Sequence, residues 1–266
     1  MNKQNPLSDF LYQLFALFIA LIIVHAIYVA VIRPNAEVIL EKQAAQQIAG
    51  NTIAYERSIY IVVKDFEQEA CFILALWVLA IMFLKTKTVL QERHLLSQTL
   101  IDINPGTSIL PEDAMEYSRP IQNLGEQPRE FLLPRTLLAG LQRFGSTKNI
   151  QDVSTSIKEI CDIESDRLDS ELSMIRYIIW AIPSIGFIGT VRGIGEALGQ
   201  AHKAVEGDIL GVTLSLGVAF NSTFIALIIS IFIMFLMHQL QLMQERLVLD
   251  THRYCDINLI RHLKVR

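Results

Sequence analysis

The sequence has few charged residues, few cysteines and no excess of basic side chains. Charged residues make up 19% of its 266 residues, below the roughly 25% of ordinary soluble domains, while 52% are hydrophobic. A net charge of −4 gives no basic surface of the kind that binds nucleic acid, so nucleic acid is not an expected partner. The three cysteines, Cys71, Cys161 and Cys255, are far apart, which argues against a disulfide framework or a zinc site. The composition indicates a membrane protein.

Patterns typical of catalysis and of cofactor binding are also missing. The six histidines have no metal-ligand spacing, and no nucleophile can be paired with a base from spacing alone. Gly193, Gly195 and Gly199 faintly resemble a dinucleotide-binding fingerprint, but no strand is predicted before them and the third glycine is misplaced. The sequence therefore predicts no enzyme, no metal site and no cofactor.

Four long apolar runs predict transmembrane helices. Phe10 to Ile32 contains no Asp, Glu, Lys or Arg, and its length exceeds the roughly 20 helical residues that cross a bilayer core. It is also longer than the apolar region of a signal peptide, about 7–15 residues, which favours an uncleaved helix. The predicted segments that contain the four spans are residues 1–32, 66–84, 175–200 and 209–238.

The segments between the spans are also predicted to be helical, because neither a strand-rich module nor an internal repeat appears. We expect an external helical hairpin at 33–65, a cytoplasmic helical region at 85–174, an external loop at 201–208 and a cytoplasmic helical tail at 239–266. Of the 23 Lys and Arg residues, 16 fall on the side of the two termini and five on the other, while Arg176 and Arg192 lie within the third span. Because the side richer in basic residues is usually cytoplasmic, we expect both termini in the cytoplasm. The predicted fold is an all-α, polytopic membrane protein with long helical cytoplasmic extensions.

The cytoplasmic region contains a short run of acidic residues. We expect these side chains to form a solvent-exposed helix face: Asp162, Glu164, Asp166, Asp169 and Glu171.

The third span has an unusual composition. Trp180 to Gly195 contains one proline, four glycines, a threonine and an arginine. Gly189 and Gly193 have the small-xxx-small spacing that allows another helix backbone to approach closely. Thr190 and Arg192 are costly in hydrocarbon and should face protein or water. The segment is typical of the lining of a protein-filled pore; the alternative is a bundle helix that uses its glycines for packing.

Polar residues of the third and fourth spans are the candidate site. Arg192 and Glu196 are four residues apart and can form an ion pair on one helix face, unless Arg192 acts in ion passage. Thr190 and Thr223 lie on oppositely directed helices and can meet, offering hydroxyls to an ion; Asn221 and Ser222 precede Thr223. Alternatively, each hydroxyl bonds a carbonyl of its own helix.

No carboxylate lies deep within a predicted span. Proton relays in membranes usually need an ionisable group, so a proton pathway here would take its acid from a partner.

Two motifs resemble a known family. Residues 181–194, Ala-Ile-Pro-Ser-Ile-Gly-Phe-Ile-Gly-Thr-Val-Arg-Gly-Ile, resemble the Pro-x-x-Gly-Leu-x-Gly-Thr-Val-x-Gly-Ile signature of the MotA/TolQ/ExbB proton-channel family. Asn221-Ser-Thr-Phe-Ile-Ala-Leu resembles the last membrane helix of that family. The resemblance covers about residues 175–240.

The resemblance implies a homopentamer in the bacterial inner membrane. Its five chains would enclose two copies of a single-span partner of the MotB/TolR/ExbD kind, each with a membrane aspartate. Passage of ions, H⁺ rather than Na⁺, would drive rotation of one component inside the other.

The family also implies roles for individual residues. Pro183 would bend the pore helix, Gly186, Gly189 and Gly193 would allow close packing, and Thr190 and Thr223 would face the aspartate of the partner. Arg192 departs from the family pattern, in which that position is usually uncharged. A second hypothesis is a non-conducting membrane scaffold or signalling protein that oligomerises through its glycines. The two hypotheses differ because only the motor needs a single-span partner with a membrane aspartate.

Overall fold

The computed structural model describes residues 6–48, 58–101, 107–205, 207 and 209–265. About 87% of the chain is helical. The described residues contain no strand, and their one isolated β-bridge joins Ile109 to Leu263. Four helices are long and apolar enough to cross a membrane. These findings confirm the predicted all-α, polytopic membrane class.

The chain divides into two compact units. The membrane unit consists of Lys3–Met82 and Met174–Met237, and it contains the apolar runs of all four predicted spans. The extramembrane unit consists mainly of Phe83–Ser173 and His238–Arg266, where the charged residues are more frequent. Two long helices, α4 and α11, contribute residues to both units.

The membrane unit is built from long helices with apolar outer faces. In chain order its elements are α1 (Pro6–Ile27), the π-helix η1 (Tyr28–Ile32), α2 (Arg33–Ile48), α3 (Ile59–Val62), the first part of α4 (Phe66–Leu96), α9 (Ser173–Gly199), α10 (Ala201–Val205) and the first part of α11 (Leu210–Asn258). Large apolar side chains such as Phe15 and Ile22 on α1 are more than 60% exposed, as expected for surfaces that contact lipid.

The first arm of the predicted external hairpin is not a separate helix. Helices α1 and α2 are joined without a break through η1, so residues 33–48 continue the helix that contains the first predicted span. Residues 49–57 of the predicted hairpin lie outside the described residues. Which stretch of each long helix lies in the bilayer, and on which side the connections lie, stays a prediction.

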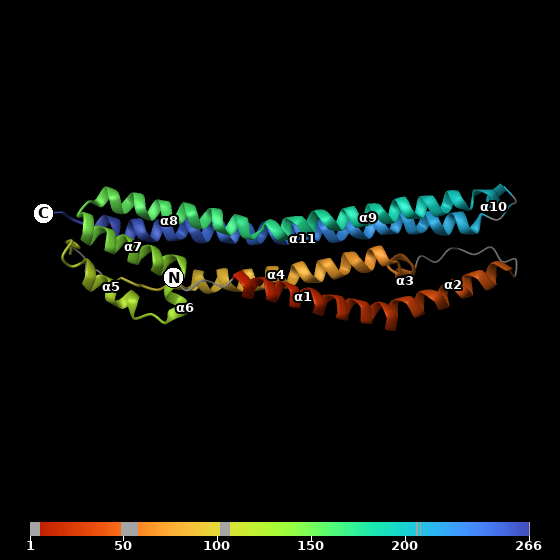
Figure 1. Ribbon diagram of the computed structural model, residues 1–266, viewed down its shortest axis with the longest axis horizontal. Coiled ribbons are helices and arrows are strands. Elements are labelled where there is room, and N and C mark those ends of the chain that lie inside the picture. The colour runs from red at the N-terminus through yellow and green to blue at the C-terminus, as the bar shows by residue number, and fades with distance from the viewer. Residues whose placement is uncertain (1–5, 49–57, 102–106, 206, 208, 266) are drawn as a thin grey trace. The chain divides into compact units, whose positions relative to one another are not determined.

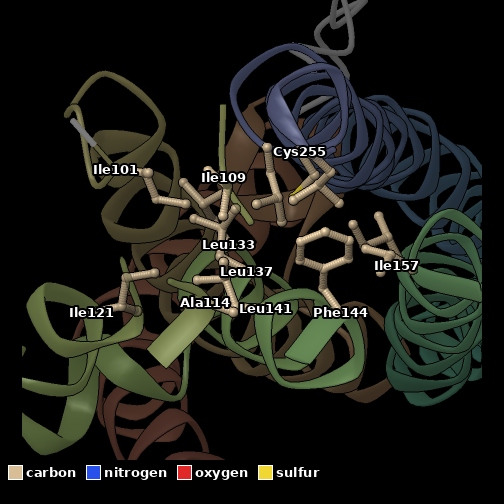
Figure 2. Close-up of a cluster of buried hydrophobic side chains, with 13 residues drawn as sticks. Ile101, Ile109, Ala114, Ile121, Leu133, Leu137, Leu141, Phe144, Ile157 and Cys255 are labelled. Atoms are coloured by element: carbon tan, nitrogen blue, oxygen red, sulfur yellow. The ribbon is translucent and has the colours of Figure 1, made fainter. Parts of the chain in front are cut away.

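The extramembrane unit is a helical bundle with a core of large apolar side chains. Its elements are the second parts of α4 and α11 together with α5 (Ala114–Gln122), α6 (Glu126–Arg129), α7 (Leu132–Thr147), α8 (Ile150–Glu171) and the 3₁₀-helix η2 (Ile260–His262). Leu137, Phe144, Ile157 and Cys255 come from α7, α8 and α11 and are completely buried together (Figure 2). Burial of these side chains is the main stabilising contribution in this unit.

The junction of α7 and α8 shows how local sequence sets the helix ends. Lys148 has a positive φ of 53° and closes α7 in the left-handed conformation. Asn149 is then the N-cap of α8, because its side-chain oxygen accepts a hydrogen bond from the backbone N–H of Gln151 at 2.9 Å. This turn brings α8 back along α7.

The predicted acidic face of α8 is wrong for Glu164, which is buried rather than solvated. Its carboxylate is 2.7 Å from Arg135 Nη2 on α7 and 2.5 Å from Arg167 Nη2 on α8. A buried carboxylate is tolerated when it is paired in this way, so Glu164 joins α8 to α7. Asp162 and Asp166 are exposed, as expected.

Candidate functional site

The glycines of α9 form the surface on which α11 packs, and the two helices lie side by side (Figure 1). A β-carbon added at Gly186 would lie 2.5 Å from that of Ala226, and one added at Gly189 would lie 2.5 Å from that of Ser222. A β-carbon at Gly193 would lie 2.7 Å from the backbone nitrogen of Ala219. None of these approaches is possible for a larger residue without a shift of backbone. Glycine therefore sets the closest approach of α9 and α11.

The facing surface of α11 consists of small side chains at intervals of three or four residues, which places them on one helix face. All of them are buried: Ser215, Ala219, Ser222, Ala226 and Ser230. Small residues drive such contacts in membranes because lipid offers no hydrophobic advantage to larger ones.

Pro183 lies inside α9, where it lacks the N–H that would bond the carbonyl of Ile179. The Ser230 hydroxyl donates to that carbonyl at 3.4 Å and is itself buried on α11. The helix continues through Pro183 from Ser173 to Gly199. Ser230 thus supplies the missing donor across the helix contact.

The hydroxyls of Thr190 and Thr223 are in hydrogen-bond contact with each other, and both side chains are half-buried. Thr190 Oγ1 lies 3.0 Å from the carbonyl of Ala219 on α11, and Thr223 Oγ1 lies 3.0 Å from the carbonyl of Gly186 on α9. The distance from Thr190 Oγ1 to the Gly186 carbonyl of its own helix is longer, at 3.4 Å. The shorter bonds to carbonyls therefore cross between the helices.

This pattern decides what the threonine pair can offer to a ligand. Each hydroxyl has one hydrogen, and two carbonyls lie within reach to accept them. One hydroxyl can donate to the other, which then donates to the carbonyl that faces it across the contact, so both hydrogens are used and only oxygen lone pairs are left over. The pair then acts as a hydrogen-bond acceptor or as a ligand for a cation.

Asn221 and Ser222 have different places from Thr223. Ser222 is buried against α9 and donates to the Val218 carbonyl of its own helix at 2.9 Å. Gln68 Nε2 of α4 lies 3.4 Å from the Ser222 hydroxyl. Asn221 is half-buried. Ser222 is thus a packing residue in this arrangement.

Arg192 binds a carboxylate on another helix more closely than the one predicted from sequence. Its Nε and Nη2 lie 2.7 Å and 2.8 Å from the two carboxylate oxygens of Glu67 on α4, which is a bidentate pair. The predicted partner Glu196 is also present, with an oxygen 3.1 Å from Nη1. Glu67 is mostly buried, whereas Glu196 is half-exposed. Arg192 therefore joins α9 to the beginning of α4.

Asp65 lies two residues before Glu67, in the segment that leads into α4. Burial raises the pKa of its carboxyl above the usual range, against the opposing charge of Lys64, whose Nζ lies 3.7 Å away. This carboxyl therefore protonates more readily than a solvated one.

The part of the chain that the structure describes contains no group of three or more His, Cys, Asp or Glu side chains placed to hold a metal ion.

Residues 129–252 match the model of the MotA/TolQ/ExbB proton channel family. This part of the chain is similar to that family. The match covers just under half of the chain and includes the glycine face, the threonine pair and Arg192. No curated protein and no solved structure matches the chain. The family consists of proton-channel subunits of the stator type and is not known as an enzyme family.

A second charged cluster lies in the membrane unit outside the part that matches the MotA/TolQ/ExbB family. Glu69 of α4 is buried, with His25 Nδ1 2.6 Å from one carboxylate oxygen and the Arg33 guanidinium on the other. The Arg33 guanidinium also lies 4.5 Å from the ring centroid of Phe66. His25 and Arg33 flank the π-helix η1. This cluster ties the first predicted span to the second.

Sequence reasoning missed both partners on α4. Glu67 and Glu69 stand at the beginning of the predicted segment 66–84, and no spacing indicates a partner for either. The contacts of Glu67 with Arg192 and of Glu69 with Arg33 join residues 125 and 36 positions apart, and no local spacing indicates them. One signal was available. Arg33, Glu67, Glu69 and Arg192 lie at or near the ends of apolar runs, where an unpaired charge would be costly.

Proposed function

We propose that the chain is the channel subunit of an ion-driven membrane motor. In this proposal, five copies surround two copies of a single-span partner of the MotB/TolR/ExbD kind in the bacterial inner membrane, with both termini in the cytoplasm. Ion-motive force is converted into rotation or other mechanical work on the partner. The observation that carries the proposal is the contact between Thr190 and Thr223 within the family's sequence.

The threonine pair is suited to read the protonation state of an approaching carboxyl group. A protonated aspartate of the partner can donate a hydrogen bond to the free lone pairs of Thr190 or Thr223. An ionised aspartate has only acceptors and meets oxygen atoms whose hydrogens are already donated within the pair or to the carbonyls of Ala219 and Gly186. The pair therefore favours the neutral acid and disfavours the anion, so loss of the proton weakens the contact.

The acid must come from the partner. Among the described residues, no carboxylate is hydrogen-bonded to either threonine hydroxyl; Glu67 and Glu69 lie at the beginning of α4 and Glu196 lies near the end of α9. Hydroxyls suit H⁺ and Na⁺ alike, and the family favours H⁺ as the ion that passes. The proposed passage of ions needs no bound cofactor.

The alternative is a non-conducting scaffold that oligomerises through its glycines. Gly186, Gly189 and Gly193 are occupied by α11 of the same chain and are closed to a second chain. A β-carbon at Gly195 or at Gly199 would meet no atom within 4 Å, so these positions are open in the isolated chain. The scaffold would have to use them, and the family match favours the channel.

Native mass spectrometry of the complex, purified in mild detergent after co-expression with the neighbouring genes, tests the proposed assembly. We expect five copies of this chain with two copies of a small single-span protein that has an aspartate in its membrane helix. A homo-oligomer that never carries such a protein would contradict the channel proposal and support the scaffold.

A further inference from the structure

The extramembrane unit has an apolar groove between the second part of α4 and the α6 region. Its volume is about 620 Å³, and its floor includes Leu90, Pro128 and Phe131. Phe83, near the end of the predicted segment 66–84, is 70% exposed, and Leu90 is 53% exposed. Lys87 and His94 lie on the rim and are both exposed. The groove is thus apolar at its base and basic at its edge.

The exposed face of α8 has the opposite character. Its apolar centre is Ile163, which is 68% exposed. The exposed acidic side chains around it, one turn before, beside and one turn after, are Glu159, Asp162 and Asp166. This acidic face consists of one apolar side chain flanked by three carboxylates; Arg167, one turn further on, is paired with Glu164 and Glu171.

Among the described residues, the charged side chains of both surfaces have no ion-pair partner. In the described ranges, no ion pair involves any of the following side chains: Lys87, His94, Glu159, Asp162 and Asp166. By contrast, the neighbouring Glu164 and Lys85 are each bound within the unit. The two surfaces therefore combine opposite unpaired charges with an exposed apolar centre.

The groove and the acidic face lie on opposite sides of the unit. Helix α7 packs against α8 on one side and against α6 on the other, and Figure 1 shows α8 and α6 separated by α7. The acidic face thus cannot fill the groove of its own chain. It can fill the groove of a neighbouring copy.

We propose that the acidic face of α8 from one copy docks in the groove of the next copy. Ile163 enters between Leu90 and Phe131, and the carboxylates around it pair with Lys87 and His94. Because two different surfaces meet, the contact is heterologous and repeats head to tail until a ring closes. The inference rests on the proposed assembly of several copies of this chain, and it does not depend on ion conduction.

Disulfide cross-linking tests this contact, with Leu90→Cys and Ile163→Cys combined in one chain and oxidised in membranes. Both substituted residues are exposed, and the native cysteines are buried. We expect a ladder of covalent multimers that ends at the size of the ring. Each single variant should give no ladder, because the two thiols must come from different surfaces. The matched control combines Ile163→Cys with Met115→Cys, an exposed apolar residue of α5 outside the groove, and should remain uncross-linked.

Reversal of charge gives a second, independent readout. Lys87→Glu and Asp166→Lys should each lower the cross-linked fraction of the double-cysteine protein, and together they should restore part of it, because positions 87 and 166 then again carry opposite charges. Efficient cross-linking of Leu90→Cys alone would mean that groove meets groove, which would overturn the proposal.

The outcomes separate this inference from the proposed function. Absence of the ladder while native mass spectrometry still shows the ring would overturn the docking contact and leave the channel proposal intact; the groove would then be open to lipid or another protein. Absence of any oligomer of this chain would contradict both.

Discussion

Helix α9 makes two contacts in the membrane unit that are held together in different ways. Against α11 it presents glycines to small residues, and the fit is steric, with backbones too close for an added β-carbon. Against α4 it presents Arg192 to Glu67, and the contact is a bidentate pair of charges. The contact with α11 depends on the absence of side chains at the glycines. The contact with α4 depends on two charged groups that must stay paired. The face of the helix on which a residue lies therefore decides whether shape or charge holds the contact.

Substitution in the steric contact should have the larger effect. Gly189→Ala places a β-carbon 2.5 Å from that of Ser222, and overpacking of this kind costs about 1–3 kcal/mol. The midpoint of thermal unfolding of the purified protein in detergent should fall. Gly195→Ala is the matched control on the same helix, because no atom lies within 4 Å of the added carbon. A similar loss for both variants would mean that glycine acts through backbone flexibility and not through packing.

Substitution in the charged contact should have a smaller effect that depends on which partner is removed. Glu67→Gln leaves Arg192 without its bidentate partner and should cost about 1 kcal/mol, the usual size for a hydrogen bond of this type at partial exposure. Glu196→Gln removes an exposed pair four residues away and should cost about 0.3–0.5 kcal/mol. Chemical unfolding of each variant measures the difference. If Glu196→Gln is the more harmful, the pair predicted from sequence is the principal one, and the α4 contact is secondary.

The steric contact was accessible from the sequence, and the charged one was not. The spacing of Gly189 and Gly193 and the proline before them are local patterns, and they indicate a helix face for close packing. The meeting of Thr190 and Thr223 followed from the opposite directions of two consecutive spans. Glu67 and Arg192 are 125 positions apart, and nothing local relates them. The fold class and the number of span-length helices depend on long apolar runs, which composition alone makes visible.

The extramembrane unit was predicted less completely for the same reason. The sequence predicts residues 85–174 only as one helical region, and it does not separate the short helices α5 and α6. Glu164 was assigned to a solvated face because its neighbours in sequence are acidic, whereas Arg135, 29 positions away, pairs with it in the interior. Short helices and buried ion pairs are specified by tertiary contacts rather than by the pattern of one segment.

The most direct test of the central claim is proton flux into liposomes that contain the complex with its partner, with both threonines changed. Thr190→Val with Thr223→Val removes the hydroxyls and keeps the shape, and we expect loss of partner-dependent flux. Thr190→Ser with Thr223→Ser keeps the hydroxyls and should conduct. The control Thr213→Val removes an exposed hydroxyl that bonds the Ile209 carbonyl of its own helix at 3.0 Å, and it should conduct normally. Undiminished flux in the double valine variant would contradict the account, because the threonine pair would then have no part in ion passage.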